Sequence, residues 1–218
     1  MLEKKKIVKE KETKIDKNIK KYVPFAIWLG VLAVVFVVFY LLFQGLGKVG
    51  YEGLTFTREK YGEVIVYHYY YLTEIADGKI RKIDVLLRGN PAENKVPVEG
   101  NITYPEGRTV YLSINNSGLN ECTYSMVALS SFSIFMANND IALKAGTPDK
   151  DEAQKNNLTY ATCGKYPGNM VISLKSGNES KIERTTGYCY NLEVTNCEIL
   201  PVIEKFIVQS ILDAKESA

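Results

Sequence analysis

Hydrophobic and polar positions divide the chain into one long apolar run and a series of shorter alternating segments. From residue 25 to 43 the sequence reads FAIWLGVLAVVFVVFYLLF, without a charged residue. A helix of this length spans about 30 Å, the thickness of the hydrocarbon core of a bilayer. A buried helix of a globular domain would show a polar stripe, and this run shows none. The pattern predicts a transmembrane helix.

Lysines gather on the N-terminal side of this run. Residues 1–21 hold nine lysines and four acidic residues, a net charge of +5, and the rest of the chain sums to −3. Because Lys and Arg beside a membrane segment favour the cytoplasmic side, we expect a cytoplasmic Lys-rich tail over 1–21, a single-pass signal-anchor helix over 22–46 and an extracytoplasmic domain over 47–218. A cleaved signal peptide is the alternative, since residues 45–47 loosely resemble a cleavage site. The apolar run is, however, longer than that of a signal peptide.

Beyond the apolar run, β-branched and aromatic residues predict a succession of strands. The longest covers 63–75 (EVIVYHYYYLTEI), and Asp77-Gly78 then offers the backbone freedom of a hairpin turn. Further strands are expected at 79–88, 96–98, 109–114, 141–144, 158–162, 170–175, 181–184 and 188–194.

Two helices are expected among these strands. One covers 123–137 and, with the strands on either side of it, predicts a βαβ crossover. The other covers 198–214, and its buried face would consist of Ile199, Val202, Ile203, Phe206, Ile207 and Ile211. Because strands dominate and helices do not alternate regularly with them, the fold class is α+β, with an N-terminal transmembrane helix and one mixed-sheet domain.

All four cysteines, Cys122, Cys163, Cys189 and Cys197, fall in the predicted outer domain. Their even number and the expected location favour disulfide bonds. Three connectivities are available, and we favour Cys189–Cys197 as a local link with Cys122–Cys163 as the second bond.

Four N-x-S/T sequons lie in the same domain, where chance alone gives roughly two. They are candidate glycosylation sites at Asn101, Asn115, Asn157 and Asn178.

Charge and motifs exclude several function classes. The net charge of +2 gives no sign of a nucleic-acid partner, and a single His with no C-x-x-C pair excludes multi-histidine metal sites and zinc ribbons. A match to G-x-G-x-x-G at residues 45–50 lacks the strand before and the helix after that a dinucleotide site requires. No cofactor is therefore expected, and catalysis would need an unfamiliar arrangement of residues.

The most unusual segment is Tyr67-His68-Tyr69-Tyr70-Tyr71. In a strand, Tyr67, Tyr69 and Tyr71 share one face, while His68 and Tyr70 share the other. Exposed rings would form a platform for a glycan or a peptide, with His68 as an acid–base or pH-sensing group. Buried rings would instead mark a strand that is covered on both faces, which we favour.

The stretch 171–208 contains VISLKSGNES and then CYNLEVTNCEILPVIEKFIV. It resembles the C-terminal part of small membrane-anchored proteins of small-genome archaea, which are similar also in their Lys-rich tail, single membrane helix and cysteine-containing outer domain. The resemblance implies an archaeal cell surface. That family has no assigned activity, so the resemblance implies no site residues.

Three functions fit these features. The favoured one is a structural or interaction protein whose partners are the lipid bilayer and a protein of the envelope or a membrane complex. The others are a ligand-binding module that uses the aromatic strand and an enzyme with an unfamiliar site.

Overall fold

A computed structural model describes residues 24–25, 27–40, 47–74, 78–107, 109–119 and 122–217. The chain divides into two compact units, Met1–Lys48 and Val49–Ala218. In the first unit residues 27–40 are helical and their large apolar side chains are exposed. Among the described residues, no helix combines the length and the apolar character needed to cross a membrane. The predicted tail (1–21) and parts of the predicted membrane segment (22–23, 26 and 41–46) lie outside the described residues.

The second unit contains a four-stranded sheet in the order β1-β2-β3-β4. Strand β2 pairs with β3, and β3 with β4, both antiparallel. The predicted antiparallel pairing of β3 with β4 is confirmed. Gly78 of the predicted turn has a left-handed φ of 77°, and Asp77 lies outside the described residues. The strands are β1 (Lys48–Tyr51), β2 (Leu54–Tyr61), β3 (Val64–Glu74) and β4 (Ile80–Leu87).

A second sheet has seven strands in the order β5-β10-β11-β9-β6-β7-β8. The β10–β11 hairpin is antiparallel, and every other pair in this sheet is parallel. The strands are β5 (Val98–Glu99), β6 (Val110–Ile114), β7 (Leu143–Thr147), β8 (Thr159–Tyr160), β9 (Met170–Ser176), β10 (Lys181–Thr186) and β11 (Cys189–Val194).

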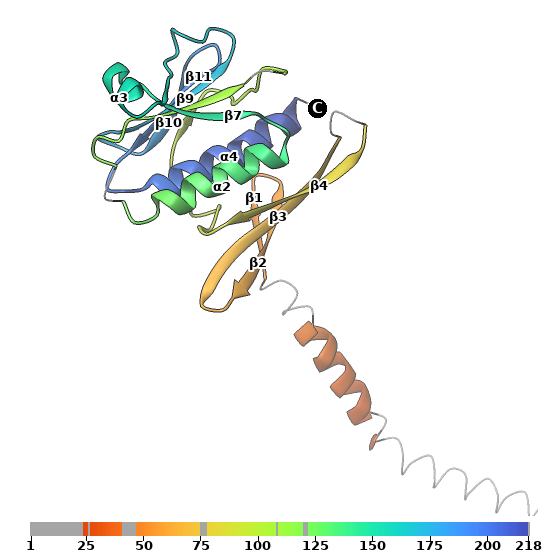
Figure 1. Cartoon of the computed structure of the whole chain (residues 1–218). Helices are drawn as coiled ribbons and strands as arrows, with labels where there is room; N and C mark the ends of the chain where they lie inside the picture. Colours follow the sequence, from red (N-terminus) through yellow and green to blue (C-terminus); the bar gives the residue numbers. More distant parts are fainter. Residues whose placement is uncertain are drawn as a thin grey trace, which may run out of the picture. The chain divides into compact units, whose positions relative to one another are not determined.

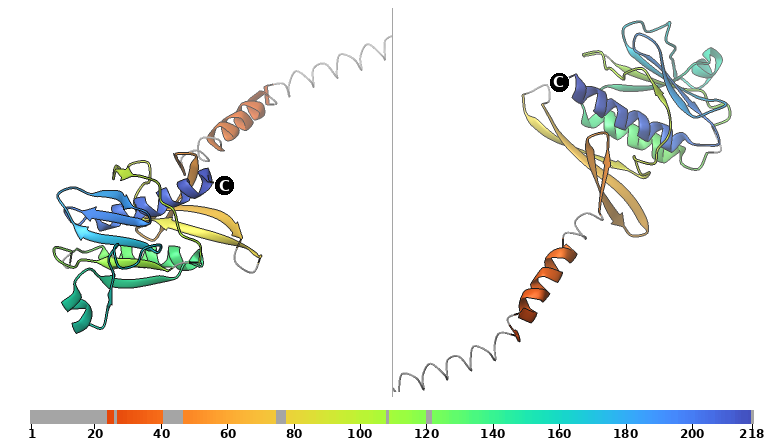
Figure 2. Two further views of the ribbon diagram at one scale, coloured as in Figure 1. Left: turned by 90° about the horizontal axis from the view of Figure 1, so that it is seen from above. Right: turned by 180° about the vertical axis from the view of Figure 1, so that it is seen from behind.

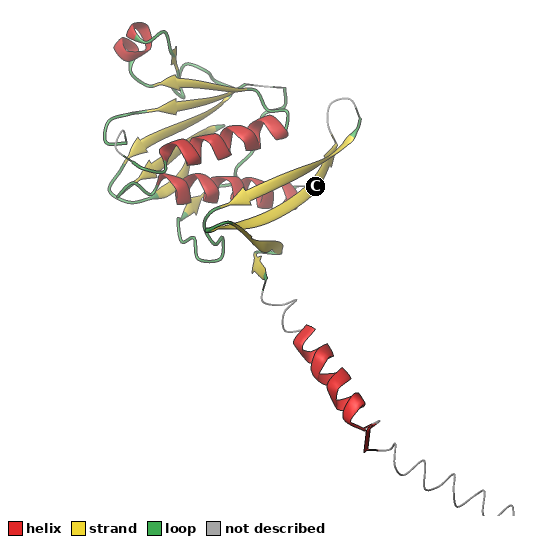
Figure 3. Ribbon diagram, turned by 60° about the horizontal axis from the view of Figure 1, so that its bottom comes forward, coloured by secondary structure: helices red, strands yellow, loops and turns green. Residues whose placement is uncertain are grey.

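Helices α2 (Ser125–Asn138) and α4 (Ile199–Glu216) lie side by side between the two sheets (Figures 1 and 3). Strands β6 and β7 are parallel neighbours joined through α2, so the predicted βαβ unit is confirmed. A third, short helix, α3 (Lys150–Lys155), adds to the two that were expected. It begins where the Asp149 carboxylate accepts hydrogen bonds from the backbone N–H groups of Asp151 and Glu152.

Helix α4 packs beside α2, as both views of Figure 2 show, and most of its residues from Ile199 to Asp213 are buried. The predicted buried face is confirmed, and the ring of Phe206 meets those of Phe132 and Tyr190 edge to face. Four polar residues of α4 are buried as well: Glu204, Lys205, Ser210 and Asp213. The described fold is thus α+β, as predicted, with one helix at the centre of its core.

Strands β1 and β2 were not predicted. Five of the eight positions in β2 (LTFTREKY) are Thr or charged residues, which weakened the strand signal. Its inward residues Leu54 and Phe56 are nevertheless fully buried, and they join the same core as the helices.

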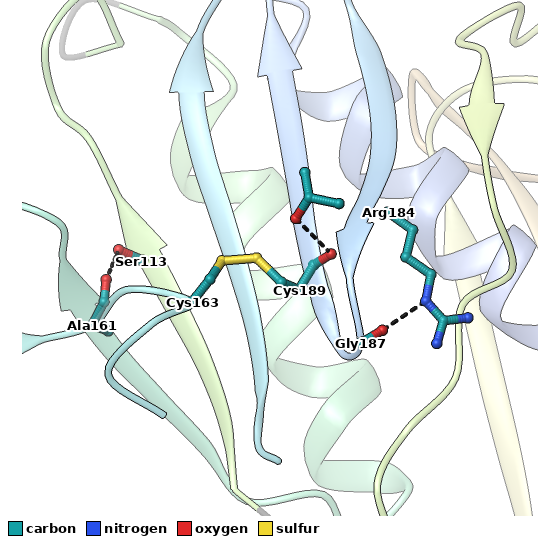
Figure 4. Close-up of a disulfide and its surroundings, with 7 residues drawn as sticks. Ser113, Ala161, Cys163, Arg184, Gly187 and Cys189 are labelled. Atoms are coloured by element: carbon teal, nitrogen blue, oxygen red, sulfur yellow. Dashed lines mark hydrogen bonds between the residues drawn. A yellow bond between two sulfur atoms is a disulfide. The ribbon is translucent and has the colours of Figure 1, made fainter. Parts of the chain in front are cut away.

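The predicted disulfide bonding is confirmed, but the favoured connectivity was wrong. Cys122 pairs with Cys197 and Cys163 with Cys189, at Cα–Cα distances of 5.1 and 5.7 Å. Cys189 begins β11 and Cys197 follows its end, so a six-residue strand separates them by about 20 Å. This exceeds the Cα spacing of about 4.4–6.8 Å that a disulfide tolerates. Figure 4 shows the bond from Cys163, in the loop after β8, to Cys189.

Candidate functional site

Strand β4 forms one edge of the four-stranded sheet, and a groove runs along it. Within the described residues β4 pairs with β3 alone. The groove has a volume of about 640 Å³, with β4 on one side and α2 on the other. An edge strand keeps one row of backbone N–H and C=O groups unpaired, so a groove of this kind can accept another strand.

Alternation along β4 decides which side chains face outward. The inward positions are buried against the helices: Ile83, Val85 and Leu87. The outward positions are Ile80, Lys82, Asp84 and Leu86, an order of apolar, basic, acidic and apolar. Ile80 is 74% exposed and Leu86 is 49% exposed. Outward positions of a half-covered sheet are usually polar, so two exposed aliphatic side chains on one edge strand point to contact with another surface.

Helix α2 supplies the other wall of the groove. Its sequence, SMVALSSFSIFMAN, is apolar around much of its circumference, so packing one side on the core leaves apolar side chains on the other. The core side holds Ala128, Phe132, Phe135 and Met136. On the groove side Met126 is 75% exposed and Ile134 is 59% exposed.

A charged cluster lies on the outward face of the same sheet. The two ring nitrogens of His68 are each 2.8 Å from a carboxylate oxygen, Nδ1 from Glu59 on β2 and Nε2 from Asp84 on β4. The Lys82 ammonium is 2.8 Å from Asp84 and lies 4.5 Å from the centre of the Tyr70 ring. The cluster therefore connects three neighbouring strands across the open face.

The cluster favours the charged form of His68. Partial burial works against the imidazolium, but hydrogen bonds to Glu59 and Asp84 outweigh it and raise the pKa of His68 above its ordinary value. The pKa of Glu59 is lowered by hydrogen bonds from Tyr61 and His68, and that of Asp84 by hydrogen bonds from Lys82 and His68. Since both ring nitrogens donate to carboxylates, neither is directed at a nucleophile.

A second pocket, of about 520 Å³, shares Val64, Arg88 and Val127 with the groove and reaches Glu204 on α4. The Glu204 carboxylate accepts hydrogen bonds from the backbone N–H groups of Arg88, at 2.5 Å, and Gly89, at 3.0 Å. Burial raises the pKa of Glu204 to about 7, although these hydrogen bonds oppose the shift. Both oxygens are engaged, so Glu204 holds the end of β4 on α4.

Gly89 explains part of this geometry. A Cβ at position 89 would lie 2.9 Å from the Glu204 carboxylate, so a larger residue here would displace that carboxylate from its present position.

The other buried polar residues of α4 are also paired. The Lys205 ammonium donates to the Tyr51 hydroxyl, Ser210 pairs with Tyr104, and Asp213 accepts from the backbone N–H of Ile102. These contacts hold β1 and the loop before β6 on the helix. None of the described residues forms a group of three or more His, Cys, Asp or Glu side chains that could hold a metal ion.

The aromatic strand presents its residues on two faces, as expected. Tyr67, Tyr69 and Tyr71 pack partly buried against the core, and the Tyr71 hydroxyl donates to Asn139 after α2. His68 and Tyr70 lie on the opposite face, over a shallow groove of about 540 Å³, and Tyr70 is 58% exposed. The favoured interpretation, a strand covered on both faces, was therefore wrong, because no second layer packs on this face among the described residues. The candidate ligand residues are thus divided between the two faces of β3.

The four sequon asparagines, at 101, 115, 157 and 178, are all exposed. The side chain of Asn115 accepts a hydrogen bond from the backbone of Ser117, the third residue of its sequon. Glycosylation of these residues stays a prediction.

Sequence reasoning missed the edge position of β4, the carboxylate partners of His68 and the burial of Glu204. The first two depend on strand order, which one sequence does not encode locally. The signal for Glu204 was weak: a polar residue inside the predicted buried face of a helix, with nothing nearby to mark its partners.

The chain matches no protein-family model, and neither a curated protein nor a solved structure is significantly similar to it. The resemblance to membrane-anchored archaeal proteins stays a prediction.

Proposed function

We propose that this protein is a membrane-anchored interaction protein whose extracytoplasmic domain binds a protein partner along the open edge of β4. The observation that carries the proposal is the groove between β4 and α2, where Leu86, Met126 and Ile134 expose apolar side chains beside an unpaired strand edge. Exposed apolar surface rimmed by polar groups is typical of protein interaction sites.

Two further observations support the location. The uncharged run at 25–43 is long enough to span a bilayer, and within it the helical residues 27–40 direct their large apolar side chains outward. Two disulfide bonds fit an oxidising compartment. We therefore propose residues 22–46 as a single-pass anchor, with the Lys-rich tail in the cytoplasm.

Alkaline extraction of membranes tests the anchor. The full-length chain should stay in the membrane pellet, and Val34→Lys with Val37→Lys should release it, because each lysine at the centre of a membrane helix costs about 2.5–3.5 kcal/mol. Release of the unaltered chain would contradict the anchor.

Site-specific photocrosslinking in native membranes tests the interaction. A photoreactive residue at Leu86 should give a discrete crosslinked species, and one at Lys155, an exposed residue of α3, should not. Equal labelling at both positions, or none at Leu86, would contradict the proposal.

A glycan- or peptide-binding module is the second candidate, and the shallow groove with His68, Tyr70 and Lys82 favours it. It has weaker support because three of the tyrosines in the aromatic strand pack against the core.

A further inference from the structure

We propose that the partner of β4 is β4 of a second copy, paired antiparallel about Ile83, so that two four-stranded sheets join into one continuous sheet. This inference rests on the proposed function, because it names the occupant of the same edge.

Strand β4 is the longest edge that either sheet offers. It has eight residues, whereas the other edge strands, β1, β5 and β8, have four, two and two. Proteins commonly protect edges by keeping them short or by placing Lys or Pro on them. β4 is long, and its outward lysine is followed two residues later by Asp84.

The outward side chains of β4 are self-complementary in one register. Residues directly opposite each other in an antiparallel pair point to the same side of the sheet. The outward faces of both copies therefore lie on the same side only if outward residues pair with outward residues, which places the two-fold axis at a residue. A slip of one residue would turn one sheet over. With the axis at Ile83, Ile80 of each copy lies opposite Leu86 of the other, and Lys82 lies opposite Asp84. Each exposed aliphatic side chain then gains an aliphatic neighbour, and each charge gains an opposite charge.

The neighbouring registers fail this test. An axis at Lys82 sets two lysines against each other and Ile80 against Asp84. An axis at Asp84 sets two aspartates against each other and Lys82 against Leu86. Like charges directly opposite destabilise a strand pair, so the sequence of β4 favours the axis at Ile83 over both neighbouring registers. A strand must be complementary to itself only if it pairs with a second copy of the same chain. Binding of a different protein would not require this pattern.

The wall of the groove fits the same occupant. Met126 and Ile134 of α2 border the edge at which the second strand would add, and both are exposed in the isolated unit. The added strand would therefore cover exposed apolar side chains of both β4 and α2.

A charge-exchange experiment on the full-length protein tests this pairing. In Lys82→Glu, two carboxylate–carboxylate pairs replace the attractive pairs of the dimer, and in Asp84→Lys, two ammonium–ammonium pairs do. Each variant alone should raise the dimer dissociation constant about tenfold.

A mixture of the two variants should recover the dimer. The carboxylate introduced at position 82 of one copy then faces the ammonium introduced at position 84 of the other, and the unaltered Asp84 faces the unaltered Lys82. Both cross-strand pairs are again attractive. A folding defect would not be corrected by mixing.

The measurements are sedimentation equilibrium in mild detergent and copurification of two differently tagged copies. Lys60→Glu is the matched control, since it makes the same charge change on β2 of the same sheet, away from β4, and should leave the dimer unchanged.

The outcomes separate the two proposals. A wild-type protein that stays monomeric, a dimer insensitive to both variants, or a mixture without recovery overturns the self-pairing. If Leu86 then crosslinks to another protein in membranes, the interaction function stands without it. If Leu86 crosslinks to nothing, both proposals fail.

Discussion

The two sheets of the second unit, Val49–Ala218, differ in what they leave accessible. The seven-stranded sheet ends in two-residue strands, and both disulfides attach to its strands or their connections. The four-stranded sheet ends in the eight-residue strand β4, and its outward face carries the cluster around His68. The first sheet thus provides a covalently reinforced framework, and the second presents a surface.

Helix α4 connects the two sheets. The helix is buried between the two sheets, and its polar side chains Glu204 and Lys205 bind the end of β4 and β1 of the four-stranded sheet. These contacts hold the four-stranded sheet from its inner side and leave its outward face uncovered. A small sheet needs its apolar face packed against other elements to be stable, and the inward residues of the four-stranded sheet pack into the same core as the helices, so the accessible surface depends on the framework.

Replacing Phe206 by Ala tests this dependence with the largest expected effect. Phe206 is fully buried against Phe132 and Tyr190, so the change should lower the free energy of unfolding by about 3–5 kcal/mol. Tyr70→Ala, on the open face, should change it by no more than about 0.5 kcal/mol. Thermal unfolding of the full chain in mild detergent measures both. A comparable loss at Tyr70 would mean that the open face is part of the core.

Removing the disulfides compares the two covalent links of the framework. Replacing Cys122 and Cys197 by Ser should cost about 2–4 kcal/mol, and replacing Cys163 and Cys189 somewhat less. The reason is that the first bond closes a loop of 75 residues and the second one of 26. Peptide mapping without reduction checks the pairing itself. Recovery of a peptide that joins Cys189 to Cys197 would contradict the connectivity.

The sequence predicted those features of the structure that depend on residues close together in the chain. Residues 199–211 repeat at helical spacing and the 63–75 run is strongly β-forming, so α4 and β3 were predicted from neighbours in sequence. The pairing of Cys122 with Cys197 and the cluster of Glu59, His68 and Asp84 arise from strand order. Contacts between segments far apart in sequence depend on that order, and no short pattern records it.

Glu204→Gln tests the attachment of the four-stranded sheet to α4. The amide keeps one oxygen for one backbone N–H and turns an N–H₂ toward the other, which should cost about 1–3 kcal/mol. The raised pKa means that the folded protein holds this proton more tightly than the unfolded chain. Wild-type stability should therefore fall as pH rises from the ordinary value of 4.5 to about 7, and the variant should lose this dependence.

Unfolding midpoints at pH 5 and pH 8 measure the effect, with Glu106→Gln, in an exposed loop, as the control. Parallel pH profiles for wild type and Glu204→Gln would show that the carboxylate does not titrate in this range.

The smallest effect concerns the outward cluster. Because the folded-state pKa of His68 is raised, its ion pairs stabilise the sheet below the ordinary pKa of 6.5, and this contribution is lost as pH rises through the folded value. His68→Gln should remove this pH-dependent loss of stability. Because the side chains of the cluster are partly exposed, solvent and salt screen their ion pairs, and the midpoint of thermal unfolding should shift by no more than about 2 °C. Measuring wild type and variant at pH 5.5 and 8.5, at low and high salt, isolates the effect. Since Glu204 titrates in both, only the difference between the two proteins reports on His68. If the pH-dependent difference in unfolding midpoint between wild type and variant does not change with salt, His68 belongs to a buried network. The four-stranded sheet would then not differ from the seven-stranded sheet in the way described above.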